Sequence, residues 1–138
     1  MNQRDLDLLR IRPEISSAIV SENMSIDEQF QNKTLRPIAK LQNDLLVEVF
    51  RNYIHKHKNA FYTFNIEKKI LFIENAIQKD IKFRNSLKGI LIGHFTIDEF
   101  GIYVENSSAL NKRMMNILKE RILQNIQLLE NKLFDDKS

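Results

Sequence analysis

Cysteine is absent from this chain of 138 residues, and its absence excludes several kinds of chemistry. A disulfide framework, zinc–thiolate sites, iron–sulfur clusters and cysteine nucleophiles all need this residue. Long hydrophobic runs are absent too, since no apolar stretch approaches the roughly 20 residues that span a bilayer. The N-terminal segment MNQRDLDLLRIRPE is charged every few residues and lacks the apolar core of a signal peptide. We therefore expect a protein of the reducing cytoplasm with no membrane span.

Glycine and proline are scarce, with three and two residues respectively. A sheet of several strands needs such residues in its turns, so their scarcity disfavours an all-β fold. The hydrophobic fraction of 43% and the charged fraction of 28% are typical of one globular domain. All three glycines lie between residues 89 and 101. They form no G-x-G-x-x-G or Walker pattern, so nucleotide binding through a glycine loop is not predicted.

Apolar residues recur every three or four positions along most of the chain, which is the period of an amphipathic helix. The pattern predicts three long helices, at about 34–57, 66–92 and 108–133. Thr34 is the expected N-cap of the first helix, and Pro37 falls in its first turn, where a missing N–H is tolerated.

The second of these segments leaves two interpretations open. Asn65 is its expected N-cap, but Asp80 and Lys82 interrupt the apolar stripe without a helix-breaking residue. The segment is therefore either one bent helix or two helices that meet near residue 80. Asp80 and Arg84 are four residues apart and are expected to pair on the helix surface.

Shorter helices are predicted by their start signals. Pro13 in RPEISSAIV suits the first position of a helix. SIDE at residues 25–28 and TIDE at residues 96–99 both match the capping box, in which two side chains satisfy free N–H groups at a helix start.

The segment from Gly93 to Phe100 is interpreted as the joint between two helices. Gly93 is placed to stop one helix in the left-handed conformation, and TIDE starts the next. Phe95 and Phe100 occupy the two positions of a hydrophobic staple. His94 is then a joint residue rather than a metal ligand.

The resulting expectation is an all-α, single-domain helical bundle over residues 1–138, with five or six helices, of which three long ones are antiparallel. Short helices are expected in residues 1–32, the main bundle in 33–134 and a frayed tail in 135–138.

Catalytic motifs are not found in the sequence. His55 and His57 are two residues apart and point in different directions on a helix, and no H-x-x-x-H or E-x-x-H pattern occurs. No G-x-S-x-G motif is present. We therefore predict no catalytic residue, no metal ligand and no cofactor.

Four cationic residues are the candidate ligand-binding site: Arg36, Arg84, Lys88 and Arg113. They lie in three segments rich in Arg, Lys and Asn, FQNKTLRPIAKLQND, IQKDIKFRNSLKG and ENSSALNKRMMN. If their helix faces converge, they form a cationic cleft for a carboxylate or phosphate. The alternative is a solvated surface with salt bridges between helices.

These three segments, together with GHFTIDEF at residues 93–100, resemble a group of short bacterial proteins that often carry the label glyoxalase. The resemblance covers about residues 10 to 130. Glyoxalase I and its relatives hold a divalent metal with His and Glu in paired β-modules. No position of this chain matches those ligands, so the resemblance assigns no catalytic residue here.

The first functional hypothesis is a non-enzymatic module that binds a partner protein or itself. Met114, Met115, Leu123 and Leu128 are its candidate interface. The alternative is an enzyme or sensor that binds a small anionic metabolite in the cationic cleft. Nucleic-acid binding is a weaker alternative, because no aromatic residues interleave with the positive charges.

Overall fold

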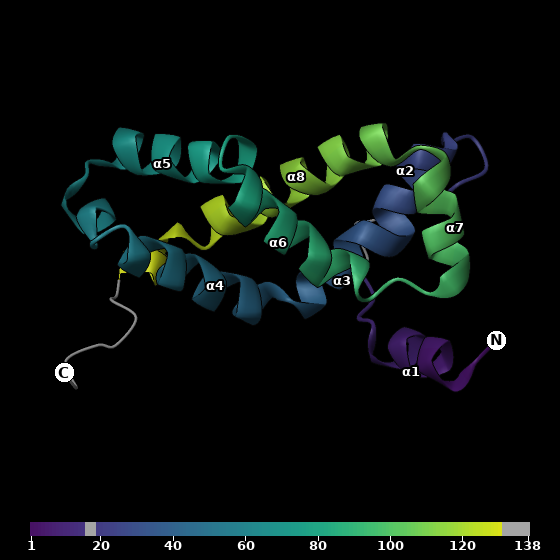
Figure 1. Cartoon of the computed structure of the whole chain (residues 1–138). Coiled ribbons are helices and arrows are strands. Elements are labelled where there is room, and N and C mark those ends of the chain that lie inside the picture. The colour runs from purple at the N-terminus through teal and green to yellow at the C-terminus, as the bar shows by residue number, and fades with distance from the viewer. Residues whose placement is uncertain (16–18, 131–138) are drawn as a thin grey trace.

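The computed structural model describes residues 1–15 and 19–130, and within these ranges it contains helices and no strand (Figure 1). The all-α fold is therefore confirmed. The helices are α1 (Gln3–Ile11), α2 (Ile26–Phe30), α3 (Arg36–Leu41), α4 (Asn43–Lys56), α5 (Ile66–Gln78), α6 (Ile81–Ile92), α7 (Ile97–Glu105) and α8 (Ser107–Gln124). A π-helical turn covers Gln31–Leu35, and 3₁₀ turns cover Ala60–Thr63 and Ile126–Glu130. The predicted tail at 135–138 lies outside the described residues.

α8 is the central helix of the molecule, because it contacts α3, α4, α5, α6 and α7 (Figure 1). Its buried side chains are Leu110, Met114, Met115, Ile117, Leu118 and Ile122. They join one apolar cluster with buried residues of the surrounding helices. Met114 and Met115 are thus part of the core, and the prediction that they form a surface interface is wrong.

The predicted helix at 34–57 is divided by a turn at Gln42. Thr34 is not its N-cap, because α2, the π turn and α3 run without interruption from Ile26 to Leu41, and Thr34 is buried in the middle of this segment.

The π turn at Gln31–Leu35 has a local cause. Pro37 cannot donate an N–H and its ring clashes with the carbonyl four residues earlier in a regular α-helix, and the wider turn before it relieves this clash.

The predicted segment at 66–92 consists of two helices, α5 and α6, as the second interpretation had it. The side chain of Asp80 caps α6, since it accepts a hydrogen bond from the N–H of Phe83 at 3.2 Å. It also accepts one from the hydroxyl of Tyr53 at 2.8 Å. These contacts take the place of the expected pair with Arg84.

The predicted helix at 108–133 ends early, at Gln124. The side-chain amide of Asn125 donates to the carbonyl of Arg121 at 2.7 Å and to Asn43 Oδ1 at 2.9 Å. It thereby satisfies a carbonyl near the helix end and ties that end to α4.

The short helices agree only in part with the predictions. Asn65 and Ser25 are N-caps as expected, each accepting a hydrogen bond from a backbone N–H three residues later. No helix starts at Pro13, since Arg12 to Ile15 are not helical. Helix α1 instead precedes this point, and Arg12 is extended because a residue before proline is disfavoured in a helix.

The joint between α6 and α7 was predicted with two errors in its geometry. Thr96 and Glu99 form a complete capping box. Gly93, however, has φ −60° and ψ −16°, so it ends α6 in the right-handed and not in the left-handed conformation. Phe95 does not staple to a buried partner at Phe100, which is 46% exposed, but packs against Phe30 and Tyr103 instead.

Candidate functional site

Helix α1 lies beside the bundle rather than within it (Figure 1). Its one buried residue is Asp5. Three of its large apolar side chains, Leu6, Leu9 and Ile11, are 39–50% exposed. Leu8 is half-buried, so polar contacts hold this helix in place together with a small apolar contribution.

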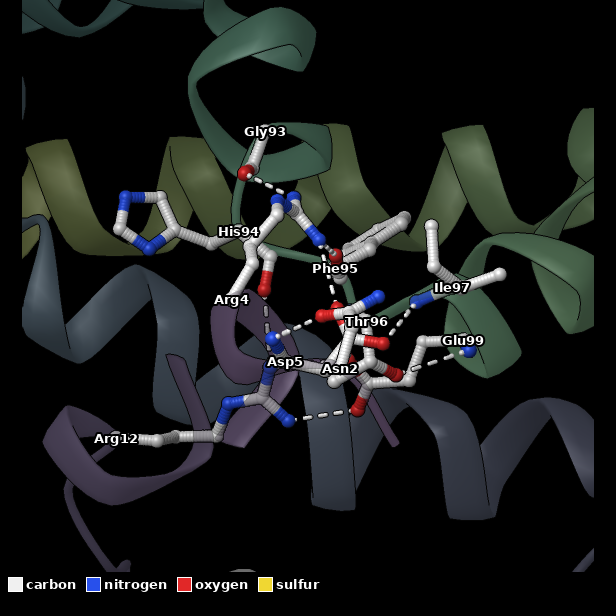
Figure 2. Close-up of polar contacts among 10 residues, drawn as sticks. All are labelled: Asn2, Arg4, Asp5, Arg12, Gly93, His94, Phe95, Thr96, Ile97 and Glu99. Atoms are coloured by element: carbon white, nitrogen blue, oxygen red, sulfur yellow. Dashed lines mark hydrogen bonds and ion pairs between the residues drawn. The ribbon is translucent and has the colours of Figure 1, made fainter. Parts of the chain in front are cut away.

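The strongest of these contacts joins Arg12 to Glu99 at the start of α7 (Figure 2). The guanidinium donates to both carboxylate oxygens, at 2.6 and 2.9 Å. The two side chains are only 8% and 12% exposed. The hydroxyl of Thr34 donates to the same carboxylate at 2.8 Å, and the N–H of Thr96 does so at 2.9 Å.

The arginines of this N-terminal segment also bind the last carbonyls after α6 (Figure 2). Arg4 donates to the carbonyls of Gly93 at 3.0 Å and Phe95 at 2.9 Å, and Arg12 donates to that of His94 at 3.1 Å. The carbonyls at a helix end lack partners within the helix and carry partial negative charge. The two guanidiniums supply both the hydrogen bonds and the positive charge.

The electrostatics of this network favour the ionised form of Glu99. Burial by itself raises the pKa of the Glu99 carboxyl, but the hydrogen bonds from Arg12, Thr96 and Thr34 outweigh it and hold the pKa below its ordinary value. All these donors bind the carboxylate form. Glu99 therefore acts as an anchor for the N-terminal segment.

His94 does not complete a metal site with Glu99. Its imidazole points away from the carboxylate in Figure 2 and contacts the side-chain amide of Gln42. Burial lowers the pKa of His94, and the nearby charges of Arg12 and Arg4 lower it further. Within residues 1–15 and 19–130, no three His, Asp or Glu side chains are grouped as metal ligands.

The outward face of α7 is a continuous apolar stripe. Ile97, Phe100 and Val104 are 62%, 46% and 52% exposed, and their spacing places them on one side of the helix together with Gly101. The buried residues of α7, Glu99 and Tyr103, lie on the opposite side. We call Ile97, Phe100, Gly101 and Val104 the α7 stripe.

Acidic residues border the α7 stripe. Asp98 and Glu105 are both exposed, and α7 contains no basic residue.

A largely apolar cavity of about 270 Å³ lies between α1, α2 and α7, and Asp98 is one of its lining residues. It is lined by Met1, Leu9, Ile26, Gln29, Phe30, Lys33, Thr34, Thr96, Asp98, Glu99 and Ile102.

The four cations predicted to form one cleft do not share a described pocket. Arg36 lies near Glu120 and Arg121, whereas Arg84 lines a separate pocket with Lys112. The α8 residues that line the Arg36 pocket are Ile117, Glu120, Arg121 and Gln124, whereas those that line the Arg84 pocket are Lys112, Met115 and Asn116, so the two arginines lie beside different stretches of α8.

The other two predicted cations line neither of these pockets. Arg113 donates to Gln31 Oε1 at 2.9 Å. Lys88 is half-buried on α6 and lines neither pocket. The Nε atom of Arg84 is buried without a hydrogen-bond partner.

The sequence did not indicate that Arg121 lines the same pocket as Arg36. Both guanidiniums line a polar pocket between α3 and α8. Because Arg113, Ile117 and Arg121 are spaced by four residues, they share one face of α8. This spacing was the available signal, but it does not show which helix packs against that face.

None of the helices in the described part of the chain is long and apolar enough to cross a membrane. Comparison with known proteins found no family model, no curated protein and no solved structure that matches this chain.

Proposed function

We propose that this chain is a non-enzymatic helical module that binds a partner protein through the α7 stripe. The partner segment is an amphipathic helix that lays its apolar face on the stripe and carries basic residues along one edge. The observation that carries this proposal is an apolar helix face turned to solvent and bordered by acidic residues alone on its own helix.

The apolar side chains of the stripe support binding because the fold leaves much of their surface in solvent, although the Phe100 ring also contacts buried Tyr103, with ring centroids 6.1 Å apart. A surface helix normally turns its apolar face to the core and its polar face to water. In α7 the core side holds Glu99 and Tyr103, and the solvent side holds Ile97, Phe100 and Val104. Contiguous apolar surface of this kind is typical of interaction sites.

Gly101 adds a second argument from the centre of the stripe. A glycine inside a helix costs about 0.5–1 kcal/mol relative to alanine. A Cβ atom at Gly101 would meet nothing within 4 Å, so packing within the chain does not require glycine there. An incoming helix approaches most closely where no side chain stands between the two backbones.

The acidic residues beside the stripe favour a partner segment that carries positive charge. Asp98 and Glu105 lie beside the stripe, so a segment with Lys or Arg along one edge gains complementary charge. A second copy of this chain, docked through the same face, would bring two acidic edges together. Like charges at an interface disfavour that arrangement.

The polar network around Glu99 supports a non-enzymatic role. Its carboxylate oxygens accept from Arg12, Thr34 and the N–H of Thr96. A carboxylate engaged in this way holds α1 and α7 together and has no role left for a substrate.

The test uses a fluorescein-labelled helical peptide with Leu at positions i, i+3, i+4 and i+7 and Lys along one edge. Its binding to the full chain is measured by fluorescence anisotropy. A matched peptide with Glu in place of Lys tests the charge. We expect the Lys peptide to bind, the Glu peptide to bind at least about tenfold more weakly, and Phe100→Asp to abolish binding.

Leu71→Asp is the matched control, since Leu71 is a 57% exposed apolar residue on α5, away from the stripe. It should leave binding unchanged. Equal loss in both variants, or equal binding of both peptides, would overturn the proposal. Size-exclusion chromatography with light scattering tests the remaining alternative, in which a second copy of this chain binds the stripe. If the wild type is a dimer and Phe100→Asp is a monomer, the occupant of the stripe is a second copy.

A further inference from the structure

A polar pocket of about 390 Å³ lies between α3 and α8, away from the α7 stripe. It is lined by Ile15, Asn32, Arg36, Ile117, Glu120, Arg121 and Gln124. Arg36 comes from α3 and Arg121 from α8, so two guanidiniums from different helices face one space. Its volume lies within the range of about 300–1,000 Å³ that is usual for small-molecule sites.

The two positive charges are only partly compensated. Arg36 pairs with Glu120 at 3.6 Å, and the Glu120 side chain is 52% exposed. Arg121 donates to Asn43 Oδ1 at 3.4 Å, which is a long contact to a neutral group. Among the described residues that line it, the pocket therefore holds two arginines and one carboxylate, that of Glu120, whose side chain is 52% exposed.

The proximity of the guanidiniums has an energetic consequence. Burial lowers the pKa of Arg121, and the charge of Arg36 lowers it further. Two like charges that repel each other in a half-buried place are relieved by an anion between them. Guanidiniums also match the planar geometry of carboxylates and phosphates with paired hydrogen bonds.

We propose that this pocket binds a small organic oxyanion, with its phosphate or carboxylate group held between Arg36 and Arg121. Ile15 and Ile117 supply apolar wall for the rest of the ligand, and Gln124 supplies an amide. In the free protein the carboxylate of Glu120 pairs weakly with Arg36, at 3.6 Å. The bound anion displaces this carboxylate from Arg36. This site is independent of the α7 stripe.

Isothermal titration calorimetry with inorganic phosphate and with succinate tests the site, with sodium chloride of equal ionic strength as the reference. Binding of phosphate alone would identify a phosphorylated ligand, and binding of succinate alone a carboxylate ligand. Arg36→Gln and Arg121→Gln should each weaken binding by at least about tenfold. Glu120→Gln should tighten it several-fold, because it removes the competing carboxylate.

Arg113→Gln is the matched control, because Arg113 lies on α8 and carries the same charge but donates to Gln31 outside the pocket lining. It should leave binding unchanged. The proposal is overturned if neither anion binds beyond the chloride reference, or if Arg113→Gln weakens binding as much as Arg121→Gln. Failure of Glu120→Gln to tighten binding would equally count against it. Circular dichroism of each variant checks that its helices remain folded.

Discussion

Arg12 and Glu99 are 87 residues apart in the sequence, and their side chains form two hydrogen bonds of 2.6 and 2.9 Å. The pair joins the extended residue after α1 to the capping box of α7. One carboxylate thus performs two tasks, since it starts α7 and holds the N-terminal segment.

Arg12→Gln should lower the free energy of unfolding by about 3–5 kcal/mol, because it leaves the buried Glu99 carboxylate without its charged partner. Arg10→Gln is the control, since the Arg10 side chain is 73% exposed and pairs with Asp7 on the helix surface. It should change the free energy by no more than about 0.5–1 kcal/mol. Urea unfolding followed by circular dichroism measures both, and equal effects would show that Arg12 is not an anchor.

Stability should decrease as the pH falls below about 6.5, the ordinary pKa of histidine. Because the pKa of His94 is lowered in the folded protein, the unfolded chain binds a proton first, and this favours unfolding. The loss ends once the pH is below the folded pKa of His94.

A second decrease should begin below pH 4.5, the ordinary value for Glu99, whose folded pKa is lowered too. Urea titrations at several pH values measure both windows. His94→Gln should abolish the first decrease and leave the second. An unchanged pH dependence in this variant would show that His94 is not its source.

Gly89→Ala should stabilise the protein by about 0.5–1 kcal/mol, because Gly89 lies inside α6 and a Cβ atom there meets nothing within 4 Å. Gly93→Ala should gain less or lose stability, since its Cβ atom would lie 3.1 Å from the carbonyl oxygen of Gly89. Thermal unfolding compares the two. A greater gain for Gly93→Ala would contradict this geometry.

Asp80→Ala should destabilise the protein more than Tyr53→Phe does. The first removes the N-cap of α6 and the acceptor of the Tyr53 hydroxyl, which together are worth about 1–3 kcal/mol. The second removes only the hydroxyl and should cost about 1 kcal/mol. Tyr53→Phe should also remove a tyrosine ionisation whose pKa is raised by burial and by Asp80, which a spectrophotometric alkaline titration detects.

Features that depend on residues three or four apart were predictable. The capping box of Thr96 and Glu99 and the N-cap at Asn65 were both found in the sequence, because the atoms involved are brought together by the first turn of the helix itself. Thr34 shows the limit of this reasoning. It has the side chain of an N-cap, but Pro37 and the preceding π turn leave it inside a longer helical segment, where it donates to Glu99.

The candidate site was not predictable in the same way. Arg36 was predicted as a site residue, and the pocket that it lines is shared with Arg121 and not with Arg84, Lys88 or Arg113. The period of a helix indicates which residues share a face. It does not indicate at which turn of α8 another helix will cross that face.

The sequence by itself determined that this chain is all-α, because the three-to-four period of apolar residues and the capping residues act within single helices. Tertiary structure decided which arginine anchors Glu99, which two arginines face one pocket, and that the apolar side of α7 faces solvent. The physical reason is that these relationships join segments far apart in the chain, so they depend on how the helices pack around α8 and not on the order of residues within any one of them.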